Sequence, residues 1–78
     1  MRQVIGDYIE NELLSGTKLE SDDQELLVSG LVDSLGVMKL ISFIGKELDI
    51  RVPPADVKLR NFATINAIVD YLETKRTP

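Results

Sequence analysis

Apolar residues recur at steps of three and four positions in three separate stretches of this 78-residue sequence. The stretches lie at residues 3–14, 34–48 and 64–75, and such spacing lines one face of an α-helix. No window alternates apolar and polar residues over more than a few positions, so strands are not expected. The predicted core residues are Val4, Ile5, Tyr8, Ile9, Leu13, Val37, Leu40, Ile41, Ile44, Leu48, Ile65, Ile68, Val69 and Leu72. The sequence therefore predicts an all-α fold.

The first connection is long. Ser15 and Gly16 supply a stop for the first helix, and residues 16–33 contain too many turn-forming residues for one continuous helix. We expect a long, partly buried loop in this region. Its apolar side chains should pack against the core, and these are Leu26, Leu27, Leu31 and Val32.

The second connection contains Pro53 and Pro54, which prevent the second helix from continuing but suit a new helix start. Residues 55–59 are predicted to form one short helix. Thr64 is expected to cap the last helix, with Phe62 folding back onto its first turns. The expected architecture is a small four-helix bundle with three longer helices and one short helix, as a single domain over residues 1–78.

Composition excludes several classes of function. The chain has no cysteine and no histidine, so it lacks a thiol nucleophile, a disulfide and the commonest general base. Aromatic residues make up 5% of the chain and the net charge is -4, which disfavours nucleic acid and anionic membrane surfaces as partners. The first residues carry acids where a signal peptide would be uncharged. We expect a cytoplasmic protein that is not a self-contained enzyme.

Two possible ligand sites have weak support. The acidic cluster Glu20, Asp22, Asp23 and Glu25 lacks the spacing of a calcium loop, so a solvated loop is the favoured interpretation. The glycines are dispersed, and none is followed by the Lys-Ser/Thr pair of a phosphate-binding loop. Neither a metal site nor nucleotide hydrolysis is expected.

Ser34 has two possible roles. It follows Asp33 at the predicted start of the second helix, so its hydroxyl should be exposed near unpaired backbone N–H groups that tolerate an anionic phosphate. The alternative is that Ser34 or Asp33 merely caps the helix. A nucleophile elbow is excluded, because Val32 stands where a glycine is needed and no histidine is present.

The outward face of the second helix offers possible contacts for a partner. A helical wheel leaves Leu35, Met38, Lys39, Ser42 and Lys46 away from the buried stripe. Exposed apolar side chains beside a helix start can mark a docking surface, although single exposed apolar residues are ordinary. Both interpretations stay open on this pattern alone.

The run Gly30-Leu31-Val32-Asp33-Ser34-Leu35-Gly36 resembles the Asp-Ser-Leu attachment site of acyl and peptidyl carrier proteins. The resemblance extends over nearly the whole chain, including residues 52–57 and 61–68. It implies that a phosphopantetheinyl transferase joins 4′-phosphopantetheine, taken from coenzyme A, to Ser34, and that this enzyme recognises Asp33. The thiol of the arm would then carry an acyl or aminoacyl thioester.

The resemblance also implies partners. These are a loading ligase, adenylation enzyme or acyltransferase, and a downstream synthase or transferase, acting on a monomeric carrier. Docking is predicted to use Leu35, Met38 and Lys39, with Arg60 and Asn61 as secondary contacts. Lys39 should face acids or an apolar groove on its partner, and Lys46, farther from Ser34, should matter less.

The subtype is suggested by departures from the fatty-acid pattern. Fatty-acid carriers typically have a strongly acidic second helix, whereas this one has Lys39 and Lys46, with Gly36 where an acid is common. The sequence looks more like free-standing aminoacyl or peptidyl carriers of specialised natural-product pathways, of the polyketide or nonribosomal-peptide kind. The alternatives are a general fatty-acid carrier and an unmodified helical protein-interaction domain.

Overall fold

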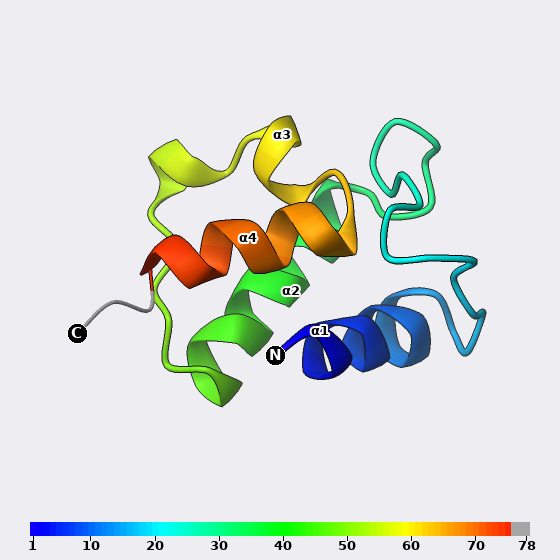
Figure 1. The fold of residues 1–78 in the computed structure, drawn as a ribbon, viewed down its shortest axis with the longest axis horizontal. Helices are drawn as coiled ribbons and strands as arrows, with labels where there is room; N and C mark the ends of the chain where they lie inside the picture. Colours follow the sequence, from blue (N-terminus) through cyan, green and yellow to red (C-terminus); the bar gives the residue numbers. More distant parts are fainter. Residues whose placement is uncertain (76–78) are drawn as a thin grey trace.

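The computed structural model describes residues 1–75, which contain four α-helices and no strand. The helices are α1 (Arg2–Tyr8), α2 (Ser34–Glu47), α3 (Leu59–Phe62) and α4 (Ile65–Lys75). A π-helical turn, η1 (Ile9–Leu13), extends α1, and a 3-10 turn, η2 (Pro54–Asp56), precedes α3. The long loop after η1 forms one end of the molecule, opposite the C-terminal end of α4 (Figure 1). The prediction of an all-α fold with three longer helices and one short helix is confirmed.

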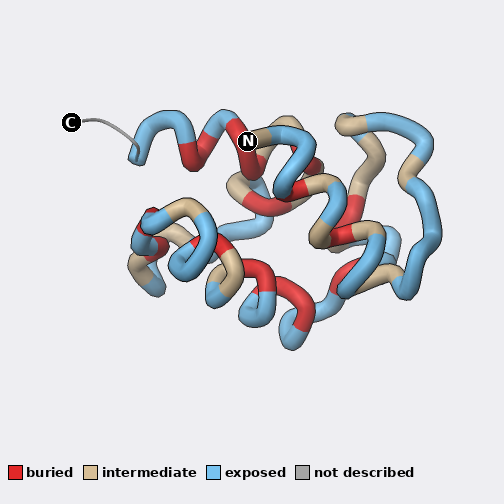
Figure 2. Tube along the Cα trace, turned by 90° about the horizontal axis from the view of Figure 1, so that it is seen from below, coloured by how far each residue is buried: buried red, intermediate tan, exposed pale blue. Residues whose placement is uncertain are grey.

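The core is mainly aliphatic and is built around side chains from α1 with η1, α2 and α4, with Phe62 and Tyr71 as its aromatic members. Ile5, Ile9, Ile44, Ile68 and Leu72 are completely buried. Buried positions recur along the inward side of each helix, with exposed positions between them (Figure 2). The predicted apolar stripes therefore form one shared core.

One predicted core residue lies at the surface. Val4 is 40% exposed, because the packed face of α1 and its extension η1 is centred on Ile5 and Ile9. Ser15 and Gly16 both have positive φ angles, 55° and 91°, which confirms the predicted stop for this helix.

The loop before α2 is attached through its backbone to the start of α4 and to the residues just before it. The Leu26 N–H donates to the Ala63 carbonyl at 2.7 Å, and the Asn66 N–H donates to the Asp22 carbonyl at 3.0 Å. Leu26 and Val32 are buried as predicted and Leu27 is half-buried, but Leu31 is exposed, so its predicted burial was wrong. The loop is not helical here, and neighbouring side chains can point to opposite sides of it.

The short helix begins later than predicted. Pro54 starts only the single turn η2, and the chain is extended at Lys58 (φ −125°, ψ 151°) before α3 begins at Leu59. The predicted helix at residues 55–59 was therefore misplaced. The predicted cap was correct, because Thr64 Oγ1 accepts a hydrogen bond from the Ala67 N–H at 2.9 Å.

Candidate functional site

Asp33 caps α2, and Ser34 is its first residue. The Asp33 Oδ1 atom accepts a hydrogen bond from the Gly36 N–H at 2.8 Å, and the Asp33 backbone is extended. The Ser34 hydroxyl is exposed and has no hydrogen-bond partner within residues 1–75. Of the two capping residues that the sequence left open, the structure selects Asp33, which leaves the Ser34 hydroxyl available for another role.

The turn that leads into α2 is organised by Glu25. Its carboxylate accepts hydrogen bonds from the N–H groups of Leu27, Val28 and Ser29 at 2.9, 2.7 and 2.7 Å. These bonds, the one from Val28 above all, hold the pKa of Glu25 below its ordinary value. The chain then turns at Gly30, which has a φ of 83° that L side chains rarely adopt. Together these features fix the approach of the chain to Ser34.

Most acids of the loop cluster form ion pairs or hydrogen bonds with other groups of the same chain. Asp22 pairs with Arg2 at 3.2 Å, and Asp23 accepts a hydrogen bond from the Asn66 side chain at 2.6 Å. With Glu25 bonded to backbone N–H groups, three of the four acids stabilise the loop. The expectation of a merely solvated loop was therefore incomplete. No cluster suited to a metal ion is found in residues 1–75.

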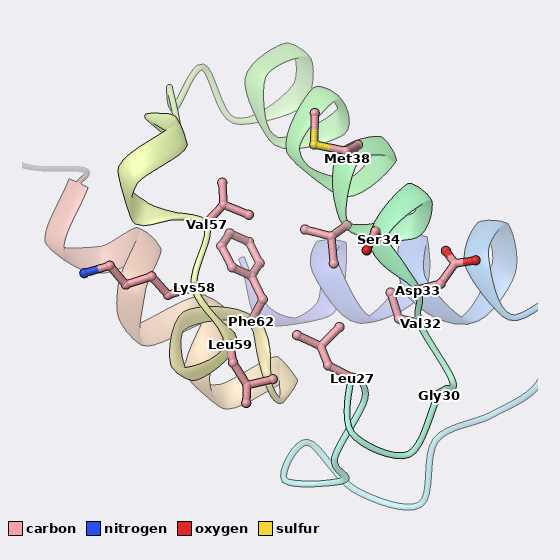
Figure 3. Close-up of a pocket in the computed structure, with 11 residues that line it drawn as sticks. Leu27, Gly30, Val32, Asp33, Ser34, Met38, Val57, Lys58, Leu59 and Phe62 are labelled. Atoms are coloured by element: carbon pink, nitrogen blue, oxygen red, sulfur yellow. The ribbon is translucent and has the colours of Figure 1, made fainter.

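A mainly apolar groove of about 500 Å³ lies beside Ser34, between α2 and the segment that leads into α3. Ser34 and Met38 lie on the α2 side, whereas Val57 and Phe62 lie on the opposite side (Figure 3). The groove is lined by Leu27, Gly30, Val32, Asp33, Ser34, Val37, Met38, Val57, Lys58, Leu59 and Phe62. Sequence reasoning missed Val57 and Leu59 as residues of the groove, because it placed both within one helix at residues 55–59. In the structure, Val57 precedes the helix and Leu59 is its first residue. The available signal was two apolar residues shortly after the proline pair.

The far wall of the groove is anchored by Asp56. Its Oδ2 atom accepts a hydrogen bond from the Tyr71 hydroxyl at 2.6 Å and lies 3.0 Å from Lys75 Nζ. The hydrogen bond from Tyr71, followed by that from Lys75, lowers the pKa of Asp56. Burial, aided by Asp56, raises the pKa of Tyr71 to about 12. Because Asp56 precedes Val57 directly, these bonds attach the groove wall to α4.

The predicted docking residues are placed differently from one another. Leu35, Met38, Lys39 and Arg60 are exposed, with Leu35 63% and Met38 57% accessible. Asn61 is half-buried, and its side-chain amide donates to the Asp56 carbonyl at 2.8 Å, so it also has a structural role. Met38 lines the groove, whereas Leu35 and Lys39 line a smaller hollow of about 210 Å³ on the side of η1. The contacts with partners stay a prediction.

No helix in the described part of the chain is long and apolar enough to cross a lipid bilayer.

Comparison with known proteins identifies the family. The family model for a phosphopantetheine attachment site matches residues 9–72, which is most of the chain and includes the loop, α2, the groove wall and most of α4. No curated protein matches the chain. The free hydroxyl of Ser34, at a helix start beside an open groove, fits the covalent group that this family holds. The chain therefore belongs to the acyl and peptidyl carrier protein family, whose members carry covalently attached 4′-phosphopantetheine.

Proposed function

We propose that Ser34 is the attachment residue, and that the chain presents an acyl or aminoacyl group, as a thioester on its arm, to partner enzymes. One observation carries this assignment: at the first position of α2, the Ser34 hydroxyl is exposed and has no hydrogen-bond partner among residues 1–75. When attached, the arm supplies the thiol that the chain lacks.

The start of α2 suits a phosphodiester on Ser34. The first four N–H groups of a helix lack acceptors within the helix. Here the Asp33 side chain accepts from one of them, the Gly36 N–H, and the Val37 N–H already donates to the Asp33 carbonyl, so the N–H groups of Ser34 and Leu35 remain for an anion. The partial positive charge of the helix start favours a phosphate there.

Other serines are less suitable. The Ser29 hydroxyl donates to the Glu25 carbonyl at 2.9 Å and so belongs to the loop structure. Ser42 is exposed but lies in the middle of α2, where the helix itself uses the backbone N–H groups. Ser34 alone among these three combines an exposed, free hydroxyl with a helix start.

The chain acts in this proposal as a carrier, and catalysis belongs to its partners. These are a phosphopantetheinyl transferase that recognises Asp33, a loading ligase, adenylation enzyme or acyltransferase, and a downstream synthase or transferase. A monomer in the cytoplasm is part of the same proposal. A specialised pathway is favoured over general fatty-acid synthesis because Lys39, Lys46 and Glu47 are the charged residues of α2, which therefore lacks a strongly acidic surface.

Mass spectrometry tests the attachment. Incubation with coenzyme A and a phosphopantetheinyl transferase should add about 340 Da, the mass of the arm, to the wild-type chain. Ser34→Ala should fold normally, because Asp33 is the capping residue, but should gain no mass. Ser42→Ala is the matched control and should be modified like wild type. An arm on Ser34→Ala would overturn the assignment, and an unmodified wild-type chain would favour the plain interaction domain.

Assigning the pathway class needs a different assay. The arm-bearing chain should accept an aminoacyl or acyl group from a loading enzyme of a specialised pathway faster than it accepts malonyl from a fatty-acid acyltransferase. The mass of the loaded species reports both reactions. A preference for the fatty-acid enzyme would return the protein to the general class of carriers.

A further inference from the structure

A second hollow lies on the side of α2 that faces α1, and we call it the lysine–aromatic hollow. Its volume is about 280 Å³, and Tyr8, Lys39, Ser42, Phe43 and Lys46 line it. The rings of Tyr8 and Phe43 are stacked with their centroids 4.1 Å apart, and both residues are half-buried. The Tyr8 hydroxyl donates to the Lys39 carbonyl at 3.3 Å, which links the ring pair to α2. The hollow thus combines an ordered aromatic pair with two lysines.

The two lysines are not neutralised by neighbouring acids. Neither Lys39 nor Lys46 forms an ion pair within the described residues. Arg2, Lys18 and Lys75, by contrast, each pair with a carboxylate at 3.2, 3.6 and 3.0 Å. The lysine–aromatic hollow therefore leaves two positive charges available on a chain whose net charge is -4.

The nearest acids are Asp7 of α1 and Glu12 of η1. Both line a neighbouring hollow that also includes Tyr8 and Phe43. Glu12 also lines the smaller hollow with Lys39, but within the described residues neither acid forms an ion pair with Lys39 or Lys46. The aromatic pair thus borders an acid-containing hollow and a lysine-containing one. A ligand that covers the aromatic pair should meet lysines along one edge and acids along the other.

We propose that the lysine–aromatic hollow binds an acidic segment of a partner enzyme, with two carboxylates against Lys39 and Lys46 and an apolar side chain on the ring pair. The lysines lie seven residues apart in α2, which corresponds to about 10 Å along the helix axis. The segment should therefore place its carboxylates about 10 Å apart, as two residues seven positions apart on a helix do.

The charge of the whole chain makes this recognition selective. A net charge of -4 repels acidic segments in general, so the two lysines provide a local attraction against an unfavourable background. Lys46 lies twelve residues beyond Ser34, about 18 Å along α2, so contact there would orient the partner along the helix. Lys46 then contributes as much as Lys39, in contrast to its small role in the sequence-based prediction. The inference rests on the proposed function only for the identity of the partner, since binding needs no arm.

A peptide titration tests the inference. The probe is a synthetic helical peptide with two glutamates seven residues apart and a leucine between them on the same face. It is added to the unmodified, isotope-labelled chain while backbone amide shifts are followed by NMR. We expect the shifts to be centred on Tyr8 and residues 39–46, and the affinity to fall as salt is added. A peptide with glutamine in place of both glutamates should bind about tenfold more weakly, since surface charge pairs each contribute a few-fold in affinity.

The matched variants change the same net charge inside and outside the lysine–aromatic hollow. The double variant Lys39→Glu with Lys46→Glu should lose about tenfold or more in affinity. Arg51→Glu with Lys58→Glu, on exposed residues outside the hollow, should lose less than about threefold through general repulsion alone. Equal losses in both variants, shifts centred on Met38 and Val57, or no binding would each overturn the proposal. Repeating the titration with Ser34→Ala separates this inference from the attachment proposal, because that variant should bind the peptide like wild type.

Discussion

The two sides of α2 use apolar residues in different ways. On the side of α3, Phe62 is 1% exposed and forms part of an apolar groove beside Ser34. On the side of α1, Phe43 is half-buried and stacks on Tyr8, in a hollow that it shares with two lysines that form no ion pair within residues 1–75. The groove side can take up apolar groups from the arm or a partner, whereas the α1 side offers charge to a protein surface.

The one amphipathic helix therefore presents two surfaces of different chemistry. The groove depends on a wall that is anchored to α4 through Asp56. The lysine–aromatic hollow depends on side chains from α1 and α2, linked by the hydrogen bond from Tyr8 to the Lys39 carbonyl. The two surfaces should therefore respond independently to mutation.

The largest expected difference concerns the two phenylalanines. Phe62→Ala should lower the free energy of unfolding by about 3 to 5 kcal/mol, because it leaves a cavity in the core. Phe43→Ala should cost less than about half as much, because its ring is already partly in water. Urea denaturation of both variants measures the difference. Equal costs would show that the α1 side is part of the core rather than a surface.

Docking residues near Ser34 should affect partners and not stability. Leu35→Ala and Met38→Ala should each weaken turnover by a partner enzyme by about 1 to 3 kcal/mol, as apolar interface residues do. Their thermal midpoints should stay within about 2 °C of wild type, because both side chains are largely exposed. Val4→Ala, an exposed apolar residue on α1, is the control and should leave turnover unchanged. Wild-type rates in both α2 variants would mean that the docking face lies elsewhere.

The anchor of the groove wall should show a pH dependence. The pKa of Tyr71 is raised to about 12 in the folded chain, above its ordinary value of 10.0. Its contribution to stability is therefore complete below pH 10 and is lost as the pH rises through about 12. Asp56 behaves in the opposite direction: its pKa is lowered, so its contribution is present above about pH 4 and is lost in stronger acid.

Tyr71→Phe separates this anchor from the rest of the fold. It should lower the thermal midpoint at pH 7 by about 4 to 8 °C, the effect of one hydrogen bond in a domain of this size. Wild type should lose more of its stability between pH 10 and 12 than the variant does. Parallel pH profiles for the two proteins would show that the anchor does not contribute.

The smallest expected effect is on association rates. Lys39→Glu should slow loading of the arm-bearing chain by its own ligase or transferase by a few-fold at low salt. The difference should shrink as salt screens charges over about 10 Å. The second-order rate constant at two ionic strengths measures it, with Arg51→Glu, an exposed residue beyond the C-terminal end of α2, as the control. A faster Lys39→Glu variant would indicate a basic partner surface and return the protein to the ordinary acidic-helix carriers.

The sequence predicted the helices well where a local signal marked their ends. The positive φ angles of Ser15 and Gly16 and the cap at Thr64 agree with the predicted ends of the first and last helices. The third helix was misplaced because a proline pair marks where a helix can start but not how far it continues. The backbone at Lys58 is extended, and the neighbouring Asp56 is held by Tyr71, a residue 15 positions away, so no local pattern indicates how this segment is placed.

The sequence by itself determined the helical class, the aliphatic core, the exposure of Leu35 and Met38, and the position of Ser34 at a helix start, since all of these depend on local spacing and capping. The choice of Asp33 as the cap is also local, because its bond partner Gly36 is three residues away. Only the tertiary structure decided that Val57 and Phe62 form a groove beside Ser34, and that Lys46 shares a hollow with Lys39 and Tyr8. These features join residues up to 38 positions apart, from Tyr8 to Lys46. Helical periodicity indicates which face of a helix is buried, but the packing of other helices against it decides what lies on each side.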